Sequence, residues 1–156
     1  MRIISGLFKG KKIFEPNDIK TRPLKDLTKE SIFNILSHSK KFEINLNKAI
    51  VLDLFSGVGS FGIECLSRGV EKVIFVENYE GVLPVLKKNL DNLKFKVNFE
   101  IIEKDIYKIE TISDPTGRLT LTGSLLSVLL PSPRLPWALR PQHAAEPSSR
   151  IAHVCC

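Results

Sequence analysis

The hydrophobic positions of the chain follow two different periods. The runs KAIVLDLF (48–55) and EKVIFVE (71–77) are continuous and of strand length, as expected for strands buried on both faces of a parallel sheet. A third run, KVNFEII (96–102), alternates and predicts a weaker strand. The stretches FGIECLSRG (61–69), closed by Gly69, and NYEGVLPVLKKNLDNLK (78–94) have helical spacing. The order strand, helix, strand, helix, strand predicts an α/β fold, a Rossmann-like half-sheet over residues 48–108 with right-handed crossovers.

The second helical stretch makes a specific prediction about its buried face. Its apolar residues recur at helical spacing, and Pro84 belongs near the first turn, where a proline is tolerated. The residues expected to face the core are Val82, Leu83, Leu86, Leu90 and Leu93.

An arm and a helix are predicted ahead of the sheet, over residues 1–40. The short apolar pieces RIIS and KKIF, separated by Gly6 and Gly10, predict a β-hairpin or an extended arm over residues 2–14. LTKESIFNILSHS (27–39) predicts an amphipathic helix packed on the domain. Its expected apolar face consists of Leu27, Ile32, Phe33, Ile35 and Leu36.

Composition changes abruptly near residue 110. All 16 lysines and all 9 phenylalanines lie in residues 1–110, whereas 6 of the 9 prolines lie in the last 46 residues. We therefore predict one domain over residues 1–110, and over 111–156 an unrelated Pro-rich tail without a defined fold. A parallel sheet that ends after about three strands would also leave apolar faces uncovered.

Basic residues cluster at the N-terminus. The net charge is +6, and residues 1–110 contribute +4 of it, from 19 basic and 15 acidic side chains. Basic charge favours polyanionic partners such as RNA through phosphate neutralisation, although a solvated basic face is the plain alternative. The candidate RNA-binding residues are Arg2, Lys9, Lys11, Lys12 and Arg22.

The cysteines and the apolar segments argue against other classes of protein. Cys65 lies alone in an apolar helical stretch, and the adjacent Cys155 and Cys156 lack metal-ligand spacing, so we expect no metal. MRIISGLFKGKK lacks the apolar core of a signal peptide. The twelve residues LTLTGSLLSVLL are too few to span a bilayer, which needs about twenty. The expectation is a cytoplasmic chain without membrane association.

The stretch DLFSGVGSFG (53–62) carries the strongest candidate chemistry. Gly57, Gly59 and Gly62 have the spacing of a loop that lets the backbone approach a nucleotide-like ligand, a pattern that dinucleotide-binding enzymes share. An acid inside the strand, Asp53, is unfavourable beside a pyrophosphate but suits the ammonium and sulfonium of S-adenosylmethionine. Glu77, after the second strand, can accept from ribose hydroxyls.

Three stretches together resemble one known family. MRIISGLFKGKKI (1–13), TRPLKDLTKESIFNIL (21–36) and VLDLFSGVGSFGIECLSRGVEKVIFVE (51–77) resemble, in order, the bacterial RsmD family. That family methylates a guanine N2 of small-subunit ribosomal RNA with S-adenosylmethionine, and the resemblance extends over about residues 1–108. It implies a methyltransferase fold, that cofactor, an RNA partner, and cofactor contacts at Asp53, Phe55, Gly57, Gly59, Glu77 and Asp105. The position of Asp105 after the third strand suits a contact with the adenine amino group.

The resemblance ends before the catalytic turn. The family presents an Asp-Pro-Pro-aromatic turn after its fourth strand, which accepts hydrogens from the target amine and stacks on the base. Here the single candidate is Asp114, followed by Pro115, Thr116 and Gly117, so the second proline and the aromatic residue are absent. The spacing from Asp105 is also short for a crossover and a further parallel strand.

Three functions remain open from the sequence. The first is an RsmD-type RNA methyltransferase by ancestry, with a cofactor-binding half and little or no turnover. The second is a non-catalytic RNA-binding module that uses the basic arm. The third is a nicotinamide-dependent oxidoreductase that uses the glycine loop, against which Asp53 and the N-terminal resemblance both argue.

Overall fold

The protein is described by a computed structural model that covers residues 1–16, 24–38, 45–93, 97–113 and 120–122. A three-stranded parallel sheet forms its centre, from β1 (Ile50–Asp53), β2 (Lys72–Val76) and β3 (Phe99–Ile102), in the order β1-β2-β3. The connections contain α2 (Ser60–Ser67) and α3 (Leu83–Asp91). The predicted succession of strands and helices is confirmed.

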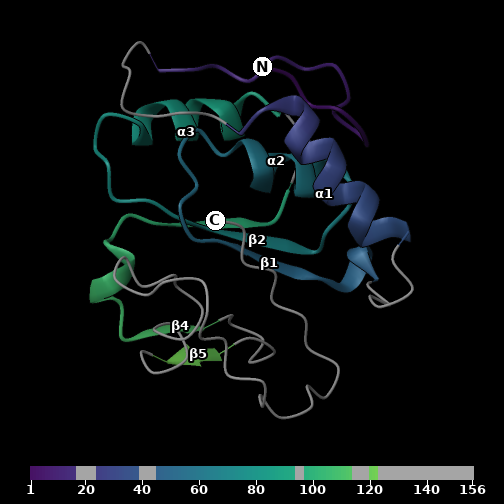
Figure 1. The fold of residues 1–156 in the computed structure, drawn as a ribbon. Coiled ribbons are helices and arrows are strands. Elements are labelled where there is room, and N and C mark those ends of the chain that lie inside the picture. Colours follow the sequence, from purple (N-terminus) through teal and green to yellow (C-terminus); the bar gives the residue numbers. More distant parts are fainter. Residues whose placement is uncertain (17–23, 39–44, 94–96, 114–119, 123–156) are drawn as a thin grey trace, which may run out of the picture.

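The side chains of the sheet alternate between two apolar clusters. Val51, Val73 and Phe75 pack with the helices in the larger cluster. Leu52 and Ile74 are fully buried in a second cluster on the opposite face. Figure 1 shows this arrangement, with α1 (Asp26–His38), α2 and α3 on one side of the sheet. Because the strands are parallel, the loops after β1 and β2 open at the same edge of the sheet.

Helix α3 has the buried face that its spacing predicts. Val82, Leu83, Leu86, Leu90 and Leu93 are all at most 8% exposed, and Pro84 lies in the first turn of the helix. Helix α2 ends at the predicted glycine, since Gly69 has φ +89° and its N–H donates to the carbonyl of Leu66. Both features were readable from the sequence because each is local.

Helix α1 forms where it is predicted but buries a different face. Phe33 is buried, stacked on Phe61 with ring centroids 5.5 Å apart, whereas Leu27 and Ile35 are 76% and 59% exposed. The predicted apolar face is therefore wrong at these two positions. Lys29 takes the place of an apolar residue: it is fully buried, and its ammonium contacts the carbonyl of Arg2 at 3.0 Å and Asp26 at 3.1 Å.

The N-terminal arm forms the predicted hairpin in a minimal form. Its two limbs are joined by an isolated antiparallel bridge between Arg2 and Lys12, with the N–H of Ile3 donating to the carbonyl of Lys11. The arm lies along the outer side of the helices in Figure 1. Its apolar side chains Ile3, Phe8 and Ile13 are buried in the larger cluster, so the arm is part of the folded domain.

A second, antiparallel pair of strands lies on the far side of the sheet. It consists of β4 (Thr111–Ser113) and β5 (Thr120–Thr122). Ile112 is 1% exposed and, with Ile106, packs in the second apolar cluster. The expectation of uncovered apolar faces is therefore wrong for the face of the sheet that carries this cluster. These two strands also contradict, over their own residues, the prediction that the chain beyond residue 110 has no defined fold. The division of the chain at residue 110 stays a prediction, and residues 114–119 and 123–156 lie outside the described part.

Candidate cofactor site

Three acidic residues lie at or just after the carboxyl ends of the three parallel strands. Asp53 is the last residue of β1, Glu77 follows the last residue of β2, and Asp105 comes three residues after β3. Because the strands are parallel, their carboxyl ends meet at one edge of the sheet, where α/β proteins bind ligands. The structure therefore brings the three predicted acids to the same edge.

The loop between β1 and α2 is held in a tight, closely packed conformation. Gly57 and Gly59 have φ values of +53° and +80°, and the N–H of Gly59 donates to the carbonyl of Ser56 at 2.7 Å. A Cβ on Gly59 would lie 2.4 Å from the Cδ1 atom of Leu86 on α3. A side chain at Gly59 would therefore push the loop away from the helix behind it.

Asp53 is buried and fastens the start of α2. Its side chain accepts a hydrogen bond from the N–H of Gly62 at 3.1 Å, and the residue is 4% exposed. Burial raises the pKa of Asp53 from 3.8 to about 7, a rise that the Gly62 hydrogen bond opposes and the Glu77 carboxylate reinforces. A carboxylate here makes the edge attractive to a positive ligand.

This raised pKa predicts a pH-dependent gain in stability for Asp53→Asn. Between about pH 4 and 7 the folded chain holds a proton on Asp53 that the unfolded chain has lost, so the stability lost through this group grows over that range and is complete above about pH 7. The amide removes that cost and keeps an acceptor for Gly62. We expect the variant to be more stable than the unmodified chain at pH 8, by on the order of 4 kcal/mol, with the difference shrinking towards pH 4.

Urea unfolding at several pH values measures this difference. Asp91→Asn is the matched control, because Asp91 is an exposed aspartate at the end of α3. An Asp53→Asn difference that stays constant from pH 4 to 8 would contradict the raised pKa.

Glu77 links the cofactor loop to the segment after β2. One carboxylate oxygen accepts from the N–H of Gly57 at 2.7 Å, and the other accepts from the N–H groups of Asn78 and Tyr79, both at 2.9 Å. These contacts hold the glycine loop against the end of β2, and the carboxylate is only partly buried. The oxygen that accepts from Gly57 retains a lone pair for a further donor, whereas the other oxygen already accepts two hydrogen bonds.

The remaining predicted contacts, Phe55 and Asp105, lie on the loops after β1 and β3. Asp105 caps the short 3-10 helix η2 (Ile106–Lys108), with its side chain accepting from the N–H of Tyr107 at 3.0 Å. Phe55 in the glycine loop is 49% exposed, and Tyr107 is 64% exposed. Exposed aromatic rings beside strand-end acids are suited to flat, polar ligands such as a nucleoside.

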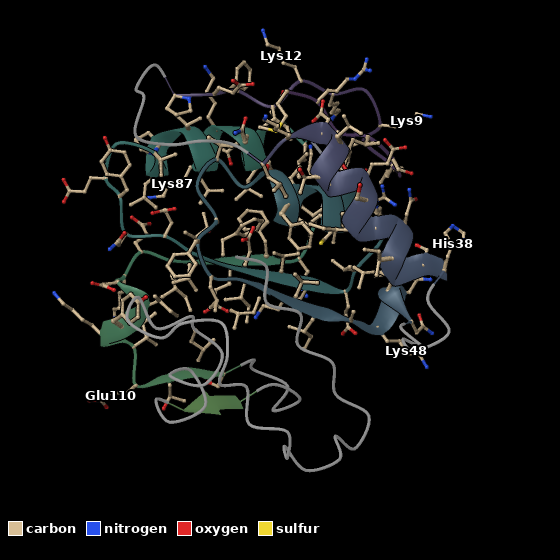
Figure 2. The ribbon with its side chains drawn as sticks, in the orientation of Figure 1. Lys9, Lys12, His38, Lys48, Lys87 and Glu110 are labelled. Carbon is tan, nitrogen blue, oxygen red and sulfur yellow. The ribbon has the colours of Figure 1, made fainter. Side chains whose placement is uncertain are left out.

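The predicted RNA-binding residues divide into two groups. Arg2, Lys9 and Lys12 are exposed, and Figure 2 shows Lys9 and Lys12 pointing away from the body of the domain. Lys11 instead donates to the carbonyls of Asn92 and Leu93, at 3.3 and 2.8 Å, at the end of α3. Arg22 and the candidate catalytic residue Asp114 lie outside the described residues.

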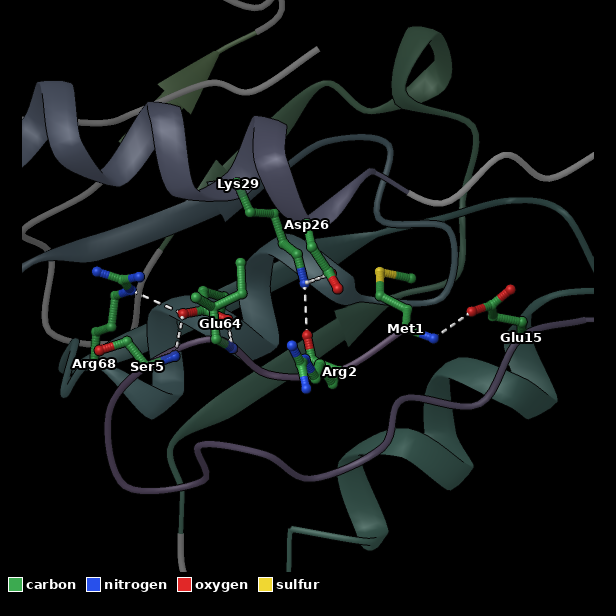
Figure 3. A network of polar contacts seen from close by, with 9 residues as sticks. Met1, Arg2, Ser5, Glu15, Asp26, Lys29, Glu64 and Arg68 are labelled. Atoms are coloured by element: carbon green, nitrogen blue, oxygen red, sulfur yellow. Dashed lines mark hydrogen bonds and ion pairs between the residues drawn. The ribbon is translucent and has the colours of Figure 1, made fainter.

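Sequence reasoning missed the polar residues that fasten the arm. Glu64 is fully buried and accepts from the N–H groups of Ile4 and Ser5, at 2.8 and 3.0 Å, and from Arg68 (Figure 3). The Ser67 hydroxyl accepts from the N–H of Phe8 at 3.0 Å. A charge within the apolar helix FGIECLS was the available signal, since a buried carboxylate requires donors.

Two other features, a metal cluster and a membrane-spanning helix, are absent from the described part of the chain. There, no group of three or more histidine, cysteine, aspartate or glutamate side chains is arranged to hold a metal ion. Within the same ranges, no helix has the length and apolar character needed to span a membrane.

Comparison with known proteins places the chain in a family. Residues 1–116 match the family described as "Conserved hypothetical protein 95", and the proteins of known name that resemble the chain include "Ribosomal RNA small subunit methyltransferase D". The chain belongs to the RsmD family. The Haemophilus influenzae protein of that name is 42% identical over 94 residues, which cover 60% of this chain and 46% of that protein. The Bacillus subtilis relative YlbH is 37% identical over 105 residues, covering 67% and 54%.

Solved structures agree with the RsmD assignment. "Putative methyltransferase yhhF from Escherichia coli" superposes with a TM-score of 0.56 at 30% identity, over 67% of this chain and 52% of that one. A Haemophilus influenzae structure gives 0.51 at 33% identity, over 73% and 57%. The parallel sheet with its helices is thus a Rossmann-like methyltransferase fold of three strands. The chain spans about half the length of the RsmD relatives that it matches.

Proposed function

We propose that this chain is the cofactor-binding part of an RsmD-type RNA methyltransferase and that it binds S-adenosylmethionine at the carboxyl edge of its sheet. The residues proposed to hold the cofactor are Asp53, Phe55, Gly57, Gly59, Glu77 and Asp105. S-adenosylmethionine would supply the electrophilic methyl group. The protein would hold the cofactor against the glycine loop and present the methyl group to a base.

The observation that carries the proposal is the Glu77 contact with the glycine loop. A 2.7 Å hydrogen bond from the N–H of Gly57 joins the loop after β1 to the acid after β2. The loop and an acceptor for ribose hydroxyls are thereby held together before a ligand arrives. A ligand with a ribose and a polar tail fits this pairing.

The environment of Asp53 favours S-adenosylmethionine over a dinucleotide. In dinucleotide sites the pyrophosphate lies at the N-terminus of the helix after the glycine loop, where free N–H groups attract an anion. Here the Asp53 carboxylate already accepts from Gly62 in the first turn of α2. A pyrophosphate would meet this carboxylate, whereas the ammonium or sulfonium of S-adenosylmethionine would pair with it.

The proposed substrate is a guanine N2 of small-subunit ribosomal RNA, and this function implies a cytoplasmic protein. The Haemophilus influenzae and Escherichia coli relatives carry the name of ribosomal RNA small subunit methyltransferase D. Arg2, Lys9 and Lys12 give the arm an exposed cationic side suited to RNA phosphates.

We expect this chain to transfer methyl groups slowly or not at all. The exocyclic amine of guanine is a poor nucleophile, so its hydrogens need acceptors and its base needs stacking. At the candidate position Asp114-Pro115 is followed by Thr116 and Gly117, which supply neither a second proline nor an aromatic ring. Transfer of labelled methyl to small ribosomal subunits measures this, and turnover at the rate of an RsmD relative of full length would contradict it.

Calorimetric titration of the whole chain tests the cofactor proposal. S-adenosylmethionine should bind with one-to-one stoichiometry, and NAD should give no heat of binding at the same concentration. Binding of NAD alone would replace this proposal with an oxidoreductase.

A non-catalytic RNA-binding module is the second candidate, favoured by the exposed cations of the arm. It predicts binding to ribosomal RNA with a steep salt dependence and no requirement for cofactor. Substituting Arg2, Lys9 and Lys12 together should then reduce the salt slope by roughly 3.

A further inference from the structure

One buried side chain on α3 contacts both the N-terminal arm and the cofactor loop. The Nδ2 of Asn89 donates to the carbonyl of Val58, between the two loop glycines, at 3.0 Å. The same nitrogen donates to the carbonyl of Phe14 in the arm at 3.0 Å, and Oδ1 accepts from the N–H of Phe14 at 2.7 Å. Asn89 is 3% exposed, so water does not replace these partners.

The Phe14 contact has the form of a strand pairing made by a side chain. The Asn89 amide forms hydrogen bonds with both the N–H and the carbonyl of Phe14, as a residue of a neighbouring strand would. Its second donor hydrogen remains for Val58. The position of the arm at Phe14 and that of the loop at Val58 are therefore set by one planar group.

Neighbouring contacts make α3 the common support of both segments. The Lys88 ammonium lies over the Phe14 ring, 4.3 Å from its centroid, and the Lys11 ammonium reaches the carbonyls at the end of the helix. On the loop side, Leu86 fills the space where a side chain at Gly59 would be. The earlier part of the arm is held separately, by Glu64 and Ser67 on α2.

We propose that Asn89 is a positioning residue that couples the arm at Phe14 to the cofactor loop at Val58, so that ordering either segment orders the other. This inference rests on the proposed function for the identity of the ligand, S-adenosylmethionine. The coupling itself is a property of the chain. In a methyltransferase it would link cofactor occupancy to the segment proposed to contact RNA.

Thermodynamic linkage makes the effect reciprocal. If the docked arm favours the loop conformation that binds cofactor, then cofactor must stabilise the docked arm by the same factor. The loss of one buried hydrogen bond sets the expected size of that factor, at about tenfold.

Amide hydrogen exchange of the whole chain without ligand tests the coupling. In Asn89→Leu, whose side chain has a similar size but no polar atoms, exchange should accelerate about tenfold at Phe14 and also at Gly57 and Gly59. Amides of the central strand β2 report global stability, and only acceleration beyond theirs counts. If Asn89→Leu does not fold, Asn89→Ser replaces it, because its hydroxyl is too short to reach both backbones.

Glu64→Gln is the matched control, because it loosens the arm at Ile4 and Ser5 without contacting Val58. It should accelerate exchange at those two residues and leave Gly57 and Gly59 unchanged. Acceleration at Phe14 alone in the Asn89 variant, with an unchanged loop, would overturn the proposal.

Addition of S-adenosylmethionine separates this inference from the proposed function. In the unmodified chain the cofactor should slow exchange at Phe14, and in the Asn89 variant it should bind about tenfold more weakly and leave Phe14 unaffected. Binding without any change at Phe14 in the unmodified chain would contradict the coupling. Failure to bind would contradict the proposed function, and the experiment without ligand would still decide the coupling.

Discussion

A Gly6→Ala chain should lose on the order of 3 kcal/mol of unfolding free energy, with the arm released from α2. Gly6 has φ +81°, and a Cβ there would lie 1.8 Å from the carbonyl oxygen of Ser67 and 2.3 Å from its carbon. Both atoms belong to the backbone of α2, which cannot move aside as a side chain would. The N–H of Leu7 also donates to this carbonyl at 2.7 Å, so that hydrogen bond would break as well.

Gly10→Ala separates the clash from backbone strain. Gly10 has φ +84° in the same arm, but a Cβ there would have no atom within 4 Å. We expect a loss of about 1–2 kcal/mol, the cost of the left-handed conformation alone. Thermal and urea unfolding of the two variants measure the difference. Equal losses would show that the arm is not packed on α2 as described.

Glu77→Gln should weaken the binding of S-adenosylmethionine by about 10- to 100-fold. The carboxylate accepts from Gly57, Asn78 and Tyr79, and an amide has only one acceptor atom for these three donors. Its NH₂ group would face an N–H, so either the loop or the segment after β2 must move. The substitution also removes an acceptor from the position proposed for ribose hydroxyls.

Calorimetric titration compares this variant with Glu80→Gln. Glu80 is an exposed carboxylate three residues further along the chain, so its substitution changes the net charge equally. Its affinity should match that of the unmodified chain. If both variants bind equally well, Glu77 is not part of the cofactor site.

The sheet was predictable because its signals are local. The apolar runs of β1 and β2 and the leucine spacing of α3 depend on residues that are adjacent or one turn apart. The strand-end acids followed from the parallel order of the strands, which places Asp53, Glu77 and Asp105 at one edge. That part of the site could therefore be located before any contact was known.

Contacts between distant segments were beyond the same reasoning. The buried face of α1 includes Lys29 because the arm supplies a backbone carbonyl at Arg2 to receive its charge. Asn89 is a polar position in a helix, and its sequence neighbours give no indication of its contacts with Phe14 and Val58. Glu64 likewise accepts from Ile4, and Lys11 donates to Leu93, only when the arm docks.

Backbone amide NMR spectra recorded during titration with S-adenosylmethionine test the central claim most directly. We predict saturable shifts at Gly57, Asn78, Tyr79 and Tyr107, which lie on the three loops at the carboxyl edge of the sheet. No shifts at millimolar cofactor, in a chain whose spectrum is that of a folded protein, would contradict the cofactor site, as would shifts confined to the arm at Lys9 and Lys12.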